Sequence, residues 1–491
     1  MFLGTGSDVG KSVVATAFCR ILKNRGYTIA PFKAQNMSNN SYVTIEGGEI
    51  GRAQATQAEA AGILPSVYMN PVLLKPTGEM GSQVIVCGSV HKNMSATDYY
   101  AQKSIIKQQV LDSYQQLCQK YQWIVLEGAG SCCEVNLRQH DIVNFEMALH
   151  ANAPVIIVAD IDRGGVFAQI IGSMALISEQ EKNLVAGFII NKFRGNPDLF
   201  QDGITFIEEY TGKPVLGLIP YYNHIHIDME DSMSLDATPV NHSKNLIQIA
   251  VVRLDHISNF TDIEALSSEP EVSIHWLKSP DRLIEYDAVI LPGSKNVIHD
   301  ISMLTQRGWS DALRSYMQQN RGIIIGLCGG YQMLGNTIQD PESVEGFRKK
   351  SSGFGLLDIH TIMDTIKVVK KSSGKENLFQ TTVRGYEIHM GQTQLGNDAK
   401  PFIDFDTHTD GAISKNASVW GTYMHGLFDS GAFRKNMLKV IAQKNQIQLN
   451  SQIEHLDYWD IKEKNYEHLA EHFQKYTQVD KIIHIAMKEH Q

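Results

Sequence analysis

The sequence predicts an α/β protein built from two parallel-sheet domains. Three observations lead to this prediction: strand-length apolar runs bounded by Gly, Pro or Asp, helical patterns between those runs, and a length of 491 residues, too long for one ordinary core. Continuous apolar strands that alternate with helices are typical of a parallel sheet covered on both faces. With 43% hydrophobic and 20% charged residues, the composition is that of a soluble globular protein.

The apolar runs fall into two groups. The first group consists of WIVLEG (123–128), APVIIVAD (153–160), VAGFIINK (185–192) and PVLGLIP (214–220). The second consists of IQIAVVRL (247–254), YDAVILPG (286–293) and GIIIGLCGG (322–330). A polar stretch separates them, so we expect a domain over 1–230, a linker over 231–245 and a second domain over 246–445. Residues 446–491 are polar and are expected to form a helical tail.

Charge and cysteine usage exclude several classes of protein. A net charge of −9 argues against nucleic-acid binding, and no run of eighteen apolar residues predicts a membrane span. No secretory signal precedes the first motif. None of the six cysteines has C-x-x-C spacing, so we expect free thiols and a cytoplasmic location. The oligomeric state stays open.

The chain begins with a short apolar stub, a glycine loop and an apolar-periodic helix. The loop reads GTGSDVGKS over 4–12, and backbone N–H groups around Gly10 are expected to cradle the phosphates of ATP. Lys11 would reach the β- and γ-phosphates, and the Ser12 hydroxyl would ligate Mg²⁺. The usual spacing would place its first glycine at Thr5. The three-residue stub is short for a strand, which suggests a start a few residues upstream.

Acidic side chains at strand ends are the candidates for metal binding. Glu127 ends the run WIVLEG, where a carboxylate in the same sheet as the loop can hold Mg²⁺ directly or through water. Asp141, Asp160 and Asp162 are further candidates, for which a structural role is equally open. We assign Asp141 a catalytic role, because a carboxylate after the EGAGS segment could bind Mg²⁺ or position an acyl phosphate.

A cysteine after an apolar strand is the candidate nucleophile of the C-terminal half. Cys328 lies in GLCGGYQ, where small neighbours permit a sharp strand-to-helix turn that exposes the sulfur and lowers the pKa of the thiol. The N–H of Gly329 would face a developing oxyanion, and the turn at Gly293 and Ser294 would supply a second donor. His425, in GTYMHGLF, is the candidate base.

Together these motifs resemble the cobyric acid synthase family, the glutamine-dependent amidotransferases of cobalamin biosynthesis. In the N-terminal half the resemblance rests on GTGSDVGKS, APFKAQNMSNNS, GRAQATQAEAAG, MNPVLLKP, EGAGS, ADIDRGGVFA and INKFRG. In the C-terminal half it rests on HISNFTD, LPGSKN, GLCGGYQMLG, RGYEIHMG and GTYMHGLFDS. It covers nearly the whole chain, whereas GLCGG alone would indicate only a class I glutamine amidotransferase.

The resemblance implies a reaction, a fold and partners. The family amidates the b, d, e and g carboxylates of adenosylcobyrinic acid a,c-diamide, a corrinoid, with one glutamine and one ATP for each. It implies a P-loop domain similar to dethiobiotin synthetase, followed by a class I glutamine amidotransferase domain. Alternatives are the sister enzyme cobyrinic acid a,c-diamide synthase and a non-catalytic P-loop switch, which would need neither Cys328 nor His425.

The resemblance also implies residue roles. Lys11, Ser12 and Glu127 match phosphate and Mg²⁺ groups, Asn191 matches an adenine contact, and Lys33 matches a lysine near the transferred phosphate. Many class I amidotransferases orient the histidine with a Glu two residues later, and here that position is Leu427. Either another group orients His425, or a Cys–His dyad works alone.

We expect the corrinoid to bind beside the phosphate loop. Ligands of open α/β sheets bind beyond the C-terminal ends of the strands. Lys33, Gln35, Asn36 and Ser38 follow the strand-like run YTIAPF, so they are expected to project at that edge. Ammonia is expected to pass between the domains along a sheltered path.

Overall fold

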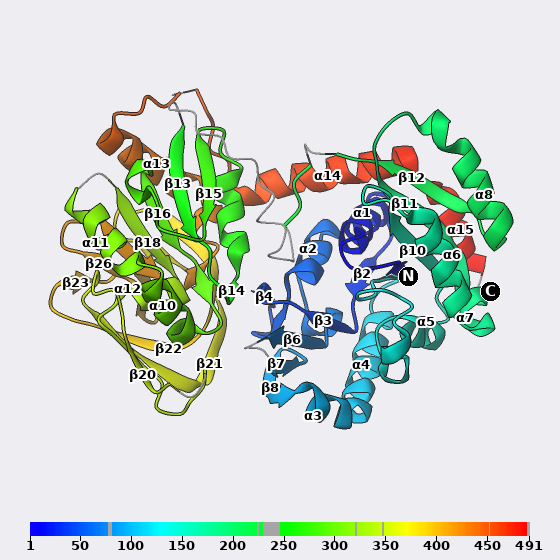
Figure 1. Cartoon of the computed structure of the whole chain (residues 1–491), viewed down its shortest axis with the longest axis horizontal. Coiled ribbons are helices and arrows are strands. Elements are labelled where there is room, and N and C mark those ends of the chain that lie inside the picture. The colour runs from blue at the N-terminus through cyan, green and yellow to red at the C-terminus, as the bar shows by residue number, and fades with distance from the viewer. Residues whose placement is uncertain are drawn as a thin grey trace.

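Two α/β units lie side by side in the computed structural model (Figure 1). The structure describes residues 1–76, 81–222, 225–228, 246–319, 322–345, 348–450 and 452–488. Each unit contains a parallel sheet, which confirms the predicted fold class. The predicted linker, 231–245, lies outside the described residues.

Six strands form the parallel sheet of the N-terminal unit (described residues 1–228). In spatial order they are β2 (Ile29–Phe32), β9 (Trp123–Leu126), β1 (Phe2–Gly4), β10 (Val155–Asp160), β11 (Val185–Phe193) and β12 (Val215–Pro220). A bridge between Phe2 and Glu127 joins β9 to β1. The carboxyl ends of these strands meet at one edge of the sheet, which is where the phosphate loop begins.

Helices cover both faces of this sheet because its strands are apolar on both sides. One face packs against α1 (Lys11–Asn24). The other packs against α5 (Phe145–Ala151), α6 (Val166–Leu176) and α8 (Gln201–Thr211). Three further helices complete the unit: α3 (Ala96–Ala101), α4 (Lys103–Cys118) and α7 (Glu179–Leu184).

An insertion between β2 and β9 was not predicted from the sequence. It forms a sheet in the order β3 (Gln35–Met37), β6 (Val72–Pro76), β7 (Gly81–Val86) and β8 (Ser89–Ser95). It also contains the pair β4 (Ser41–Val43) and β5 (Glu49–Gly51), followed by α2 (Arg52–Ala60). Figure 1 shows these elements on the side of the unit that faces the C-terminal unit.

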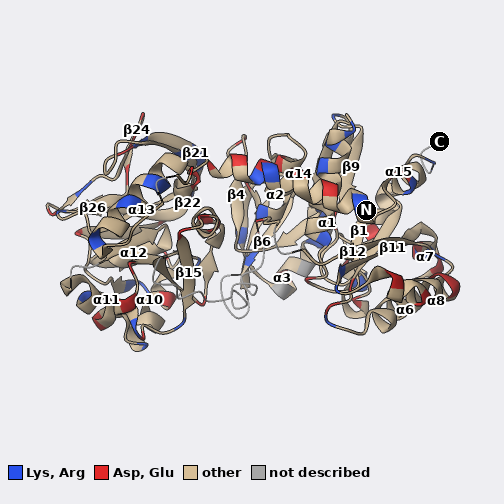
Figure 2. Cartoon of the chain, turned by 90° about the horizontal axis from the view of Figure 1, so that it is seen from above, with Lys and Arg blue, Asp and Glu red and all other residues tan. Residues whose placement is uncertain are grey.

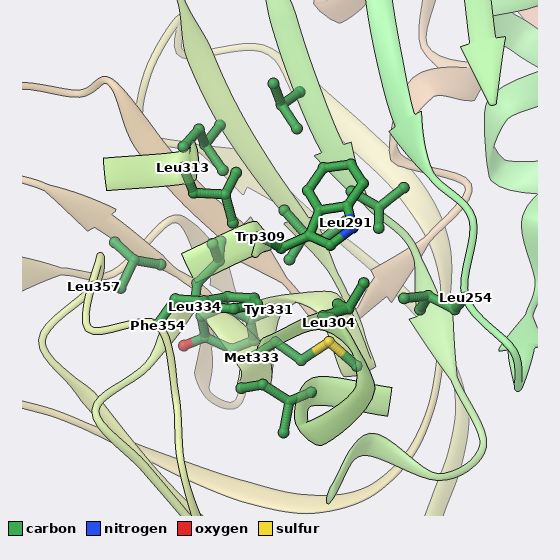
Figure 3. Close-up of a cluster of buried hydrophobic side chains, with 14 of the residues drawn as sticks. Leu254, Leu291, Leu304, Trp309, Leu313, Tyr331, Met333, Leu334, Phe354 and Leu357 are labelled. Atoms are coloured by element: carbon green, nitrogen blue, oxygen red, sulfur yellow. The ribbon is translucent and has the colours of Figure 1, made fainter. Parts of the chain in front are cut away.

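A seven-stranded sheet organises the C-terminal unit (described residues 246–450). Its order is β15 (Val272–Leu277), β13 (Ile247–Val252), β16 (Ala288–Leu291), β18 (Ile323–Leu327), β27 (Val419–Thr422), β26 (Ala412–Ser414) and β23 (Ala399–Lys400). The first five strands are parallel. The helices are α9 (Glu264–Ser267), α10 (Val297–Gln306), α11 (Trp309–Gln318), α12 (Gly329–Leu334) and α13 (Gly431–Asn445). Figure 3 shows Trp309, Leu313 and Tyr331 in the core on one side of this sheet.

A second, mostly antiparallel sheet extends this unit and was also not predicted. Its order is β20 (Lys350–Ser352), β19 (Thr337–Gln339), β21 (Ile359–Glu376), β22 (Thr382–Leu395) and β28 (Met424–His425). The smaller elements are β24 (Ile403–Phe405), β25 (Thr409–Asp410) and the pair β14 (Ile257–Ser258) with β17 (Gly293–Ser294).

The C-terminal segment returns to the N-terminal unit. Helix α14 (Tyr458–Tyr476) spans from one unit to the other in Figure 1, and α15 (Val479–Lys488) follows it. Leu469 and Phe473 of α14 pack into the core beneath α1. The buried Arg20 of α1 pairs with Glu463 and Glu467. The sheet of the N-terminal unit is therefore covered partly by the far end of the chain.

The described helices contain no stretch that is both long and apolar enough to cross a membrane. In the view of Figure 2, Lys and Arg are interspersed with Asp and Glu over both units.

Candidate active sites

Cys328 occupies a strained turn between β18 and α12. Its backbone has φ 50° and ψ −108°, an unusual conformation for a residue with a side chain. The turn is tight, because a Cβ at Gly330 would lie 1.9 Å from the carbonyl oxygen of Leu291. The thiol is largely buried, and its Sγ lies 3.5 Å from the carbonyl oxygen of Ile388. The strain holds the sulfur at the carboxyl edge of the sheet.

His425 lies beside this thiol and is oriented by Asp262. The Nδ1 of His425 is 2.7 Å from one oxygen of Asp262, and the other oxygen accepts the N–H of Gly426 at 3.0 Å. Burial lowers the pKa of His425, but the charge and hydrogen bond of Asp262 and a hydrogen bond with Cys328 outweigh it and raise that pKa to about 10. The arrangement favours a protonated imidazole beside Cys328.

Asp262 is a residue that the sequence analysis did not identify. It resolves the question left open by Leu427, because the orienting carboxylate comes from a segment 163 residues before the histidine. Residues 256–262 carried part of the family resemblance, but no spacing rule connects a carboxylate there to His425. Only the fold brings them together.

The predicted oxyanion donors lie next to the thiol. A Cβ at Gly329 would lie 2.7 Å from the backbone nitrogen of Ser294, so the two backbones are in close contact. At the end of the β14–β17 pair, the backbone N–H of Lys295 donates to the carbonyl oxygen of His256. Because N–H groups alternate in direction along an antiparallel pair, the N–H of Ser294 points away from β14. The hydroxyl of Ser294 is held by Asp300 at 2.7 Å. Gly293 precedes Ser294 in β17.

A small pocket of about 50 Å³ opens at Cys328 and has walls from both units. Lys75 and Gln83 belong to the N-terminal unit, whereas Gln332 and Lys367 belong to the C-terminal unit. The Oε1 of Gln332 is buried and has no partner among the described residues, so it can accept a hydrogen bond from a ligand. The pocket has the polarity for a small polar group such as the side-chain amide of glutamine.

A buried cluster of ion pairs lies beside this pocket, and one of the pairs joins the two units. Glu49 of β5 pairs with Lys75 of its own unit at 2.5 Å and with Lys367 of β21. Burial lowers the pKa of Lys75 to about 8, and the pairing with Lys367 and Lys75 holds the pKa of Glu49 well below its usual value despite burial. Loss of either ion pair would leave a buried charge without a partner, so these residues favour one arrangement of the two units.

In the N-terminal unit, the phosphate loop is closed around the ammonium group of Lys11. Its Nζ donates to the carbonyl oxygens of Gly6 and Gly130, both at 2.8 Å. Burial and the nearby Lys33 lower the pKa of Lys11 to about 8, so an anion placed between the two lysines would be stabilised. Gly10 has φ 99°, and a Cβ there would lie 2.2 Å from the side-chain nitrogen of Asn191.

Asn191 fixes the backbone of the phosphate loop. Its Nδ2 donates to the carbonyl oxygen of Val9 at 3.0 Å, while its buried Oδ1 has no partner among the residues described. An adenine contact stays a prediction, and the free oxygen is the atom that could make it.

Glu127 is the centre of the predicted metal site. One carboxylate oxygen accepts Ser12 at 2.7 Å and Lys33 at 2.9 Å, and the other accepts the amide nitrogen of Gln57. Burial favours the neutral acid, but Lys33 and these hydrogen bonds hold the pKa of Glu127 below its usual value. The site therefore contains a carboxylate and a hydroxyl in contact, which are ligands that Mg²⁺ prefers. The donor set fits Mg²⁺ and a phosphate chain.

The other acidic candidates have protein partners. Asp141 accepts the N–H groups of Val143 at 2.8 Å and Asn144 at 2.9 Å, so it orders the start of α5. Asp160 pairs with Lys192, and Asp162 pairs with Arg194. Asp141 also lines a cavity, and its catalytic role stays a prediction.

That cavity has a volume of about 590 Å³ and lies between the EGAGS loop and the insertion. Gln35 and Met37 line it, along with Gly130 and Ser131 next to the phosphate loop. Of the four polar residues predicted to project at this edge, Gln35 lines the cavity and Lys33 reaches the phosphate-loop site, whereas the prediction is wrong for Asn36 and Ser38. Lys33 bonds to Glu127, Asn36 bonds to Gln54, and Ser38 is buried against Asn40, because the segment turns inward to join β6.

Comparisons with known proteins agree with this two-part organisation. Residues 1–235 match the CobQ/CobB/MinD/ParA nucleotide binding domain, and residues 248–433 match the CobB/CobQ-like glutamine amidotransferase domain. A cobyric acid synthase from Syntrophobacter fumaroxidans is 45% identical, with 98% of this chain and 97% of that protein covered.

Two further relatives bear the same name. The protein from Chlorobium phaeobacteroides (strain BS1) is 46% identical, with 98% of each chain covered. The one from Listeria monocytogenes serotype 4a is 44% identical, with 100% of this chain and 96% of that protein covered. Because such relatives match almost the whole chain, it belongs to the cobyric acid synthase family and is a glutamine-dependent amidoligase.

Proposed function

We propose that the protein amidates the b, d, e and g carboxylates of adenosylcobyrinic acid a,c-diamide to give adenosylcobyric acid. Each amide would consume one ATP and one glutamine. The observation that supports this most directly is the pairing of two sites in one chain. A Cys328–His425–Asp262 cluster lies on one side of a buried interface, and the Lys11–Ser12–Glu127 cluster lies in the unit on the other.

In the N-terminal unit, the protein has to make a carboxylate reactive. Lys11 and Lys33 would hold the phosphate chain of ATP, and Ser12 and Glu127 would hold Mg²⁺. When bound, Mg²⁺ neutralises charge on the phosphates. The lysines keep the γ-phosphoryl group in line with the substrate carboxylate, which becomes an acyl phosphate that ammonia can attack.

In the C-terminal unit, the protein releases ammonia from glutamine. The Cys328 thiolate attacks the side-chain carbonyl carbon, while the N–H groups of Gly329 and Ser294 face the developing oxyanion. His425 then gives its proton to the departing ammonia, and a thioester remains on the sulfur. Water, deprotonated by the same imidazole, hydrolyses the thioester to glutamate.

The cavity beside the phosphate loop is the proposed corrinoid site. Its wall combines apolar side chains, such as Met37 and Leu74, with the polar Gln35 and Asp141. An apolar ring with polar side arms would match such a wall. Polar and charged side chains such as Lys103, Arg138 and Asn144 also line the cavity, which suits a substrate rich in carboxylates and amides.

Mass spectrometry of the corrinoid product tests the function. The purified protein would be incubated with adenosylcobyrinic acid a,c-diamide, ATP, Mg²⁺ and glutamine. Four added amides are expected, and omission of Mg²⁺ should abolish them. Amidation of cobyrinic acid at a and c alone would instead identify the sister enzyme, and glutamine hydrolysis without any amidated corrinoid would contradict both.

Six free cysteines and the use of ATP support a cytoplasmic location.

A further inference from the structure

Helix α2 is polar and yet fully buried. Each of its nine residues, RAQATQAEA, is buried. One face, with Arg52 and Glu59, is explained by ion pairs: Arg52 with Asp228, and Glu59 with Lys462 of α14 at 2.7 Å. The helical period places Thr56 on this face as well.

The opposite face of α2 points toward the synthetase site. It carries Gln54 and Gln57, three residues apart and therefore neighbours on the helix surface. Gln57 donates to Glu127, and Gln54 accepts from Asn36 at 3.0 Å. The remaining amide atoms, Nε2 of Gln54 and Oε1 of Gln57, are buried with no partner among the described residues. An unpaired buried polar atom costs about 1–3 kcal/mol of folding free energy. Two such atoms on one face of α2 therefore need an explanation other than stability.

The polar row continues from this face toward the other unit. A Cβ at Gly51 would lie 2.4 Å from the nitrogen of Asn36, 2.9 Å from the oxygen of Gln54 and 3.2 Å from the oxygen of Asn70, so three amides converge there. Gly51 pairs with Ser41 in the β4–β5 ladder. Two residues before Ser41, the Oδ1 of Asn39 is also buried without a partner in the described chain.

Ser41 in turn contacts the glutaminase site. Its N–H donates to Asn259 at 3.2 Å, and Asn259 lines the Cys328 pocket. Its carbonyl oxygen accepts the hydroxyl of Tyr386 at 3.3 Å, and the ring of Tyr386 stacks on His425 with centroids 5.3 Å apart. Contacts thus lead from His425 to Gln54 and from Gln57 to Glu127, and the two glutamines share one face of α2.

We propose that this row is the route of ammonia between the two sites, with Asn39, Gln54 and Gln57 as the groups that guide it. Ammonia both donates and accepts hydrogen bonds, so the amide oxygens of Asn39 and Gln57 can accept from it and the amide nitrogen of Gln54 can donate to it. The inference rests on the proposed function, because it needs ammonia released at Cys328 and consumed at Glu127.

Charges at the start of the route favour neutral ammonia over ammonium. Lys75, Lys295 and Lys367 line the Cys328 pocket, and burial and the other two lysines hold the pKa of Lys295 well below its usual value. Glu345, the carboxyl group that lines the pocket, is buried, which raises its pKa to about 8 and leaves it mostly neutral at pH 7. A cation would be repelled there, whereas neutral ammonia would not.

The Gln54→Leu variant tests the route in the full chain. Leucine fills a similar volume but offers no hydrogen bond. Glutamine-dependent amidation should fall about tenfold, the equivalent of one buried hydrogen bond, while glutamine hydrolysis continues. Amidation driven by ammonium salt should stay at the parent rate. The ratio of glutamate formed to amide formed should therefore rise about tenfold.

Thr56→Val is the matched control. It removes another buried oxygen without a described partner, on the other face of the same helix, and should leave the ratio at the parent value. Asn39→Leu should raise the ratio as Gln54→Leu does, and it replaces Gln54→Leu if that variant fails to fold. A parent ratio in a folded Gln54→Leu or Asn39→Leu protein would overturn the route. Absence of amidation by the parent with either nitrogen source would count against the proposed function instead.

Discussion

The two proposed active sites differ in how much of their geometry the protein holds ready. At Cys328, the nucleophile, the histidine and Asp262 are already in contact around a pocket of about 50 Å³. At Glu127, both carboxylate oxygens are occupied by protein donors beside a cavity of about 590 Å³. The first site binds one small molecule, so its catalytic residues can be held in place before that molecule binds. The second would receive ATP, a metal and a corrinoid, so some of its internal bonds have to be exchanged on binding.

Cys328→Ala gives the sharpest separation of the two sites. Without the thiol no thioester forms, so glutamine-dependent amidation should fall by about a thousandfold or more. Amidation with high ammonium salt should persist, because the Glu127 site is untouched. Both rates are measured by corrinoid product formation. Loss of both in a folded variant would mean that the sites are not separable.

Lys11→Ala should have the complementary effect. Removing the ammonium group should lower amidation with glutamine and with ammonium salt alike, on the order of a thousandfold, because phosphoryl transfer precedes attack by either nitrogen source. Glutaminase activity provides the control and should remain measurable. An ammonium-dependent rate near that of the parent would show that Lys11 does not hold the phosphates.

Asp262→Asn tests how far the preformed geometry depends on one carboxylate. Glutaminase kcat/KM should fall about a hundredfold. The raised pKa keeps His425 protonated up to about pH 10. Without the charge of Asp262, burial would lower that pKa, so the imidazolium would be lost at a lower pH. The alkaline limb of the glutaminase profile should therefore move down in pH. An unshifted limb would leave Asp262 with a purely structural role.

Asp141→Asn should have the smallest effect. Asparagine also caps helix ends well, so the cost in unfolding free energy should be under about 1 kcal/mol. If the carboxylate also acts at the cavity, amidation should slow more than glutamine hydrolysis. Parallel assays of the two activities decide, and equal losses would assign Asp141 to structure alone.

The structural elements that were predicted correctly are those with a pattern inside a single segment of the sequence. The glycine loop, the strand before Cys328 and the apolar runs of both sheets each have a signature that one segment carries by itself. The sheet of the insertion and the long strands β21 and β22 were not predicted; strand β8 of the insertion and both long strands are partly exposed and polar in sequence. A polar strand has little periodic signal to distinguish it from a loop.

The site residues that were not predicted depend on tertiary contacts. Asp262 meets His425 across 163 residues, and Gln57 meets Glu127 across 70. Asn36 and Ser38 were predicted to face the corrinoid because polar residues next to a strand usually face solvent or a ligand. That prediction was wrong. Here Asn36 faces the buried amides around Gly51, and Ser38 is buried against Asn40.

The return of α14 to the N-terminal unit has a consequence for synthesis of the chain. The ribosome makes the phosphate loop first, but Leu469 and Phe473, which seal the core beneath α1, emerge more than 450 residues later. At about 5–20 residues per second, this delay amounts to tens of seconds. The unit that begins the chain is thus among the last to be completed. Until then, α1 exposes an apolar face that is a target for chaperones, and a fragment ending near residue 230 would keep that face exposed permanently.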